Sequence, residues 1–335
     1  MLNRFLSMAA GAILLSTLTG CGQNETGSAS SGAAGSKPPQ IAVIPKATTF
    51  TFWKAVHAGA EAAAKEAGAE VIWQGPSSEG DRRGQIDVVQ NFVSRQVDAI
   101  VLAPLDAKAL ARPVEQAVAR EIPVVVIDSG LDSESHASFV ATDNTEGGRM
   151  AARRLAEVMG GKGDVILLRY QEGSASNDER EDGFLAEVKE KYPEIKVLSS
   201  NQYAGTTKDS AMKVSQNLLN KFGNEVDGIF CPNEPVAFGM LRALETSKLA
   251  GKVKFVAFDA GESLIKAMRE GAIHGLIAQD PYGMGYEGVK TALSVLAGET
   301  VDRRIPTRIV SITPENLDTD EIQALIQPEV AASTE

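Results

Sequence analysis

The stretch IAVIPKATTFTFWKAVHAGAEAAAKEAG, residues 41–68, decides the fold. It begins with a short apolar run, IAVIP (41–45), and continues into FWKAVHAGAEAAAKEAG, in which alanines and other apolar residues recur at helical spacing. Gly68 is placed to end the helix, because glycine readily adopts the left-handed conformation of helix C-termini. The stretch therefore predicts a buried strand that leads into an amphipathic helix.

The same unit recurs along the chain. AEVIW (69–73) precedes GQIDVVQNFVSRQ, DAIVLAP (98–104) precedes AKALARPVEQAVAR, and IPVVVID (122–128) contains a further strand. Continuous Val/Ile runs are typical of strands buried on both faces, and regular alternation with helices predicts parallel sheets with right-handed crossovers. The pattern restarts near residues 142–145 and continues to about residue 271. We therefore predict an α/β fold of two doubly wound parallel-sheet lobes.

The first residues of the chain have a different character. A start that contains Arg4 is followed by the apolar run LSMAAGAILLSTL, which predicts a signal peptide over residues 1–20. LTGC (18–21) resembles the bacterial lipobox, in which the cysteine thiol receives a lipid. The Gly/Ser/Ala-rich residues that follow predict a flexible tether, so residues 21–39 are expected to hold lipidated Cys21 and its tether. The alternative is a leader followed by an unrelated buried or paired cysteine.

Composition argues against several classes of partner. The chain has 33 Lys+Arg and 44 Asp+Glu, and removal of the predicted leader takes Arg4 away, which leaves 32 against 44 and a net charge of about −12. Such an acidic surface argues against nucleic acid and anionic lipid as partners. Cys231 is the only other cysteine, so lipidation of Cys21 would leave no intrachain disulfide.

Motifs for catalysis or metal binding do not assemble in the sequence. His57, His136 and His274 form no metal-ligand spacing with another His, Cys or acidic pair. GGKGD (160–164) lacks the glycine spacing and the Lys-Ser/Thr ending of a phosphate loop. We expect Cys231 to be a small buried residue. The sequence therefore predicts neither an enzyme nor a cofactor or metal site.

Polar side chains follow the predicted strands, where open parallel sheets bind their ligands. These loops are rich in carboxylates, amides and prolines and poor in pairs of a nucleophile and a base. They contain Pro45 and Lys46, Pro104 and Asp106, Asp128 to Gly130, Gln171 to Asp178, Pro232 to Glu234, Asp259, and Gln279 with Asp280.

Eight segments in order carry a resemblance to a known family: FWKAVHAGAEAAAKEAG, DAIVLAPLDAKAL, IPVVVIDSG, ATDNTEGG, DEREDGF, GIFCPNEPVAFGMLRAL, VKFVAFD and GLIAQDP. Over roughly residues 40–312 the chain resembles the type I periplasmic binding proteins of sugar ABC importers, the ribose-binding protein group. The resemblance implies a two-lobed clamp with a three-stranded hinge, which closes on a monosaccharide-sized ligand or polyol and delivers it to an ABC permease.

The resemblance also implies the domain boundaries. The chain is expected to cross between the lobes near Asp143, Gln279 and Arg308. The predicted N-terminal lobe comprises residues 40–143 plus 279–308, and the C-terminal lobe comprises residues 144–278 plus 309–327. Residues 328–335 are expected to form a tail.

The ligand contacts implied by the resemblance divide into two kinds. Phe52 and Trp53 fall where the family stacks aromatic rings on the sugar, and hydroxyl partners are expected at Asp128, Asn233, Asp259 and Gln279. From the residues alone, the two aromatic side chains could instead staple the first helix to the core. Asp128 or Asp259 could likewise cap a following helix.

Three departures from the ribose-type pattern predict altered specificity. A loop asparagine of the family is replaced around Thr49 and Phe50, and another is replaced by Ala103. Asp178 stands where the family has a sugar-binding arginine, and Arg180 lies two residues further on. The ribose-type set of hydrogen bonds is therefore expected to be incomplete.

IPK and QGP (74–76) resemble instead the autoinducer-2 receptor branch, which has a lysine at the place of Lys46, an aspartate at the place of Asp178 and backbone contacts near Pro232. That branch has a glutamine where this chain has Glu179. The predicted ligand-binding set is therefore Lys46, Phe52, Trp53, Asp128, Asn177, Asp178, Asn233, Asp259 and Gln279.

Two alternative functions follow from the resemblance. One is an autoinducer-2 type signal receptor. The other is a sugar-responsive repressor of the same fold, which would carry a helix-turn-helix domain of about sixty residues ahead of the lobes. This chain has a leader, a cysteine and a tether there instead.

Overall fold

The computed structural model describes residues 37–326. The predicted signal peptide, Cys21, most of the predicted tether and the predicted tail lie outside these residues. No helix within the described range combines the length and the apolar character needed to cross a membrane.

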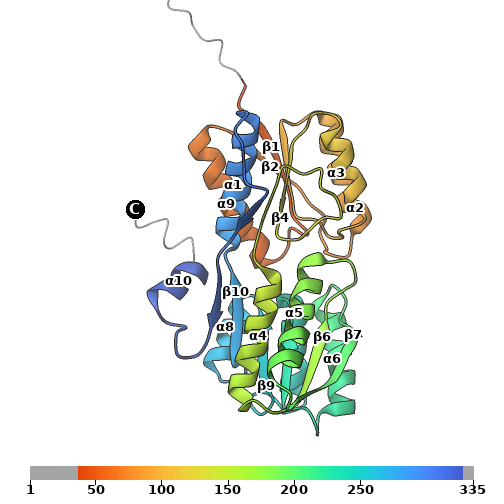
Figure 1. Cartoon of the computed structure of the whole chain (residues 1–335), viewed down its shortest axis with the longest axis vertical. Helices are drawn as coiled ribbons and strands as arrows, with labels where there is room; N and C mark the ends of the chain where they lie inside the picture. The colour runs from red at the N-terminus through yellow and green to blue at the C-terminus, as the bar shows by residue number, and fades with distance from the viewer. Residues whose placement is uncertain (1–36, 327–335) are drawn as a thin grey trace, which may run out of the picture. The chain divides into compact units, whose positions relative to one another are not determined.

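The first of two six-stranded sheets contains β1, β2 and β4 of Figure 1. Its strand order is β11-β5-β4-β3-β1-β2. All of its neighbouring strands are parallel. Its strands are β1 (Gln40–Ile44), β2 (Glu70–Trp73), β3 (Ala99–Leu102), β4 (Val124–Ile127), β5 (Ser138–Ala141) and β11 (Arg304–Pro306).

Both faces of this sheet are covered, because successive strand residues point to opposite sides. Ile41 and Val43 of β1 belong to the cluster with α1 and α9, whereas Ala42 and Ile44 belong to the cluster with α2 and α3. The covering helices are α1 (Thr51–Ala67), α2 (Arg82–Arg95), α3 (Ala111–Val118) and α9 (Pro281–Leu296). Burial on two sides explains the continuous Val/Ile runs in the sequence.

The second sheet has the order β12-β10-β9-β8-β6-β7. Its strands are parallel except β12, which pairs antiparallel with β10. They are β6 (Gly163–Arg169), β7 (Ile195–Tyr203), β8 (Gly228–Cys231), β9 (Lys254–Phe258), β10 (Gly275–Gln279) and β12 (Ile309–Ile312).

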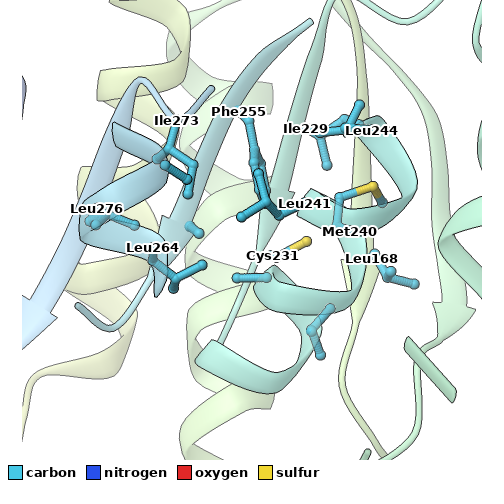
Figure 2. Close-up of a cluster of buried hydrophobic side chains, with 14 of the residues drawn as sticks. Leu168, Ile229, Cys231, Met240, Leu241, Leu244, Phe255, Leu264, Ile273 and Leu276 are labelled. Carbon is cyan, nitrogen blue, oxygen red and sulfur yellow. The ribbon is translucent and has the colours of Figure 1, made fainter. Parts of the chain in front are cut away.

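Helices cover both faces of the second sheet as well. On one face Ile229, Cys231 and Phe255 pack with Met240 and Leu264 in a large apolar cluster (Figure 2). The opposite face carries α4 and α5, whose Leu155 and Phe184 join a separate cluster. The helices of this lobe are α4 (Asn144–Met159), α5 (Ala175–Lys191), α6 (Lys208–Phe222), α7 (Glu234–Thr246), α8 (Glu262–Arg269) and α10 (Asp320–Ile326).

The chain passes between the two sheets three times. It leaves the first sheet after β5, returns after Gln279 at the end of β10, and leaves again between β11 and β12. The Thr142 hydroxyl donates to Gln279 Oε1 at 2.9 Å and lies 3.3 Å from Thr307 Oγ1. The three connections are therefore joined by one buried and one partly buried hydrogen bond.

The prediction of two doubly wound α/β lobes is confirmed. The strand and helix pattern did not predict β5, β11, β12, α9 or α10. Two of these strands are edge strands of three or four residues that are largely exposed or half-buried, so they lack the apolar run that identifies a central strand. Within the described residues, all neighbouring strands are therefore parallel except β10 and β12 at one edge of the second sheet.

Candidate ligand pocket

A pocket with about 410 Å³ of empty space, part of it open to solvent, lies where the carboxyl ends of strands from both sheets meet. Both lobes contribute to the wall, as expected for a site between two lobes. The residues that line it are Lys46, Phe50, Phe52, Trp53, Glu79, Asp128, Ser176, Asn177, Arg180, Asn233, Glu234, Pro235, Asp259 and Gln279.

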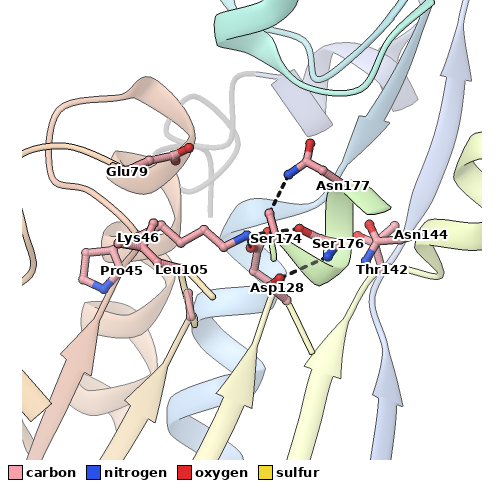
Figure 3. Close-up of polar contacts among 12 residues, drawn as sticks. Pro45, Lys46, Glu79, Leu105, Asp128, Thr142, Asn144, Ser174, Ser176 and Asn177 are labelled. Carbon is pink, nitrogen blue, oxygen red and sulfur yellow. Dashed lines mark hydrogen bonds and ion pairs between the residues drawn. The ribbon is translucent and has the colours of Figure 1, made fainter. Parts of the chain in front are cut away.

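A buried ion pair forms one side of the pocket (Figure 3). Lys46, two residues after β1, extends toward Asp128, which directly follows β4, and their charged groups are 2.7 Å apart. The Lys46 ammonium also donates to Ser176 Oγ at 3.0 Å. Because Ser176 belongs to α5 of the other lobe, this one lysine connects both halves of the wall.

The aromatic side of the pocket comes from the start of α1. The rings of Phe52 and Trp53 are 5.0 Å apart in an edge-to-face arrangement. Trp53 is only 2% exposed and belongs to the apolar core of its lobe, whereas Phe52 is half-buried. Trp53 therefore fills both roles that the sequence left open: it packs into the core and it borders the pocket.

Glu79, in the loop between β2 and α2, receives two hydrogen bonds. Its Oε1 accepts from the Trp53 indole at 2.8 Å and its Oε2 accepts from the Tyr170 hydroxyl at 2.5 Å. Burial raises the pKa of Glu79, and the nearby Lys46 opposes that rise. Sequence reasoning missed Glu79 because its loop carries no motif.

Arg180 of α5 forms the opposite wall. Its guanidinium stacks 3.8 Å from the Phe258 ring, its Nε donates to Asn144 Oδ1 at 2.9 Å, and its Nη1 donates to the Pro232 carbonyl at 2.9 Å. Arg180 is 2% exposed, and its Nη2 has no hydrogen-bond partner among the described residues. The same holds for Oδ1 of the buried Asn177, so the wall presents one unpaired donor and one unpaired acceptor.

Two glycines allow α5 to bring Arg180 to this place. A Cβ on Gly148 of α4 would lie 2.0 Å from the Arg180 carbonyl oxygen, and a Cβ on Gly183 would lie 2.2 Å from the Thr145 carbonyl oxygen. Such distances are far below van der Waals contact, so the two helices can approach this closely only because both positions lack a side chain.

Asp128 and Asp259 occupy equivalent positions in the two lobes. Each directly follows the fourth strand of its sheet, counted from β2 and β7, and each has a left-handed backbone, with φ of 64° and 69°. Asp259 accepts from the Glu234 amide at 2.9 Å and from Gln279 Nε2 at 2.8 Å. Burial raises the pKa of Asp259, and Arg180 opposes this.

Of the nine residues predicted to bind ligand, eight line the pocket. Among them, Asn233 also caps α7, because its Oδ1 accepts from the Val236 amide at 3.2 Å. The exception is Asp178, which is half-buried and lines a different cavity with Asp106 and Glu179.

The pocket contains an arginine, although Asp178 stands at the place of the family's arginine in the sequence. The structure places Arg180, rather than Asp178, in the pocket wall. One helical turn separates successive pocket-facing positions of α5, so Ser176 and Asn177 face the pocket together with Arg180, whereas Asp178 points elsewhere. That spacing was the signal that could have found Arg180.

Cys231 and His274, the other residues considered for catalysis, lie in surroundings that suit a structural role. Cys231 is fully buried in an apolar cluster, which raises the pKa of its thiol. His274 accepts from the Phe255 amide through Nδ1 at 3.2 Å, and burial lowers its pKa to about 4. Within residues 37–326, no group of three or more His, Cys, Asp or Glu side chains is arranged to hold a metal ion.

Comparison with known proteins gives the family. Residues 41–300 match the model of the periplasmic binding protein domain, and the chain belongs to this family. The ribose import binding protein of Escherichia coli is 31% identical over 268 residues, which cover 79% of this chain and 88% of the relative. The xylitol-binding protein of Mycolicibacterium smegmatis is 29% identical over 313 residues, which cover 92% of this chain and 85% of the relative.

Solved structures agree with the fold. A carbohydrate transporter solute-binding protein from Agrobacterium radiobacter, in complex with D-arabinose, is 39% identical and superposes with a TM-score of 0.83. The alignment covers 87% of this chain and 99% of that chain. An ABC transporter solute-binding protein from Agrobacterium vitis, bound to α-D-tagatopyranose, is 31% identical with a TM-score of 0.82 over 86% of this chain and 99% of that one.

Proposed function

We propose that this chain is an exported solute receptor that closes on a monosaccharide or a related polyol and delivers it to an ABC import permease. The observation that carries the proposal is the pair of unpaired polar atoms in the pocket wall, Arg180 Nη2 and Asn177 Oδ1. A buried polar atom without a partner is costly. A hydroxyl group, which both donates and accepts, satisfies such a pair.

The rest of the wall suits the same kind of ligand. Asp128 and Asp259 provide carboxylate oxygens, which accept strong hydrogen bonds from hydroxyls. Phe52 and Trp53 provide an aromatic surface against which the C–H face of a sugar ring can pack. The relatives support this choice, because their names specify ribose, xylitol, D-arabinose and tagatopyranose as ligands.

The two-lobed wall also supplies a mechanism. A ligand that bonds to Asp128 in one lobe and to Arg180 in the other binds the closed arrangement more tightly than an open one. Binding therefore shifts the population toward closure, and the closed lobes present the surface that a permease recognises. The hinge would lie at the three connections joined by Thr142.

Lys46 supports autoinducer-2 as an alternative ligand. Its position in the pocket beside Asp128 matches the expectation for an autoinducer-2 type receptor. Asp178, the other residue expected for that branch, lies outside the pocket. A neutral sugar or polyol is therefore the better-supported ligand, with autoinducer-2 as the alternative.

We further propose that the receptor is anchored to a bacterial membrane through lipid on Cys21. The support is the LTGC motif at residues 18–21 and the Gly/Ser-rich residues after it. Mass spectrometry of the protein from its native membrane tests this, because lipidated Cys21 would be the new N-terminal residue. An N-terminus at any other position contradicts the anchor.

The ligand is tested by calorimetry on the purified full chain with D-ribose, D-arabinose, D-tagatose, D-fucose, xylitol and autoinducer-2. Mass spectrometry of a sample after incubation then shows whether the bound molecule is released unchanged. Saturable binding of one of the sugars or xylitol, without turnover, is expected. Failure of every compound to bind would contradict a sugar receptor, and binding of autoinducer-2 alone would favour the alternative.

A further inference from the structure

The carboxylate of Glu79 is shared by groups from both lobes. Trp53 belongs to the apolar core of the first lobe, and Tyr170, which follows β6, belongs to that of the second. Both donate to Glu79, one to each oxygen. Glu79, Trp53 and Tyr170 are 8%, 2% and 1% exposed, so water is largely excluded from these bonds.

The Tyr170 hydroxyl is the donor in this arrangement. Burial and the adjacent Glu79 raise the pKa of the phenol well above its usual value, so it keeps its proton. A hydrogen bond to a carboxylate in a dry setting is stronger than one between neutral groups. The bond from Tyr170 to Glu79 is therefore expected to hold the lobes together more strongly than a solvent-exposed contact would.

Two neighbouring contacts between the lobes lack such a second connection to the aromatic wall. Arg82 donates to the Glu172 carbonyl at 2.7 Å, and the Ala107 amide donates to the Gly173 carbonyl at 3.0 Å. Neither reaches a side chain of the pocket's aromatic wall. Only Glu79 among these groups holds a pocket ring with one oxygen and the opposite lobe with the other.

We propose that Glu79 is a positioning residue that couples the orientation of Trp53 in the pocket wall to closure of the two lobes. When the lobes separate, Glu79 loses Tyr170 and keeps only Trp53. When they close, both oxygens are engaged and the indole is fixed in the wall that faces the ligand. The predicted effect on ligand affinity rests on the proposed function as a solute receptor. The predicted effect on closure of the lobes can be measured without a ligand.

Four variants of the full chain separate the two roles of Glu79. Tyr170→Phe removes only the hydroxyl that comes from the other lobe. Glu79→Leu removes both acceptors, whereas Glu79→Gln keeps an oxygen for the indole and offers its amide to the Tyr170 oxygen. Tyr203→Phe removes a tyrosine hydroxyl at a 39% exposed position of the same lobe as Tyr170 and is the control.

Hydrogen exchange without ligand measures opening through peptides that cover residues 74–81 and 170–176. Tyr170→Phe is expected to speed exchange in both peptides about tenfold, the loss expected for one hydrogen bond to a charged group. Glu79→Leu should exceed this, while Glu79→Gln and Tyr203→Phe should stay close to the parent protein. Unchanged exchange in Tyr170→Phe would overturn the proposal.

Calorimetry with D-arabinose, D-ribose and xylitol gives the second measurement. For whichever compound binds, the affinity should fall about tenfold in Tyr170→Phe, fall further in Glu79→Leu and be rescued in Glu79→Gln. A lower melting temperature without any change in affinity or exchange would show a purely structural role and overturn the coupling. If none of the compounds binds the parent protein, the sugar receptor fails, but the exchange result still decides the link between the lobes.

Discussion

The Lys46 ammonium and the Asp128 carboxylate lie 2.7 Å apart, with side chains only 4% and 5% exposed. A buried charge without a partner would destabilise the fold, so the ammonium and the carboxylate each offset the cost of burying the other. The lysine's additional bond to Ser176 means that the pair also connects the lobes. A site for a neutral sugar does not require a buried cation, so this pair is the most unusual feature of the pocket.

Replacement of Lys46 by Met is expected to destabilise the protein, because it leaves the Asp128 carboxylate buried without its cation. Removal of one partner of such a pair typically costs about 3–5 kcal/mol. Urea denaturation measures the free energy of unfolding, and the double variant Lys46→Met with Asp128→Asn should recover part of the loss. Wild-type stability and ligand affinity in the single variant would mean that the lysine contributes to neither.

Replacement of Arg180 by Lys is expected to weaken ligand binding at least tenfold. Lysine cannot stack on Phe258 and bond to Asn144 and the Pro232 carbonyl while it offers a further donor to the pocket. Calorimetry with the best ligand of the panel measures the change. Asp178→Asn on the same helix is the control and should leave the affinity within about twofold; a larger effect there than at Arg180 would reverse the two roles.

Glu181 should make stability depend on pH. Burial raises its pKa from 4.5 to about 7, although the Tyr170 amide and Arg169 donate to it. The folded state therefore binds more protons than the unfolded state between these values. The stabilising contribution is fully present below about pH 4.5 and is lost as the pH rises through 7, with a loss on the order of 3 kcal/mol.

Urea denaturation at pH 5 and pH 8 checks this expectation for Glu181. The difference in the free energy of unfolding between the two pH values should be smaller in Glu181→Gln than in the parent protein. Glu225→Gln, at an exposed position, serves as the control and should retain the parent difference. An unchanged difference in Glu181→Gln would show that this carboxyl is not the group responsible.

Replacement of Gly148 by Ala should disturb both stability and binding. The new methyl group would lie 2.0 Å from the Arg180 carbonyl oxygen, so α4 and α5 must separate. We expect a loss of about 1–3 kcal/mol in the free energy of unfolding, together with weaker ligand binding as Arg180 shifts. Denaturation and calorimetry measure the two effects, and Lys189→Ala on the exposed side of α5 should show neither.

The sequence predicts the central parts of the fold because burial on both faces leaves a direct trace in composition. Strands such as Val124–Ile127 are uniformly apolar, and helices such as Thr51–Ala67 end at a glycine. The edge strand Arg304–Pro306 has no such trace, because it is defined by its pairing with β5. Pairing between distant segments cannot be read from local pattern.

The same distinction applies to the pocket. Asp128 and Asp259 could be predicted because they directly follow buried strands. Glu79 lies in an irregular loop, and its place depends on Tyr170, which is 91 residues away in the chain. The predicted set included Asp178 instead of Arg180, because a match along the sequence does not show which face of a helix turns toward the pocket.

The left-handed backbone at Asp128 and Asp259 has a consequence for engineering. Residues with a side chain pay about 1 kcal/mol in this conformation, which glycine adopts freely. Glycine at either position would remove this backbone cost, but it would also leave Lys46, or the Glu234 amide and Gln279, without a partner. Because those losses are larger than the backbone gain, glycine at either position should lower the free energy of unfolding. The backbone strain at the two aspartates is thus held in place by the contacts that their carboxylates make.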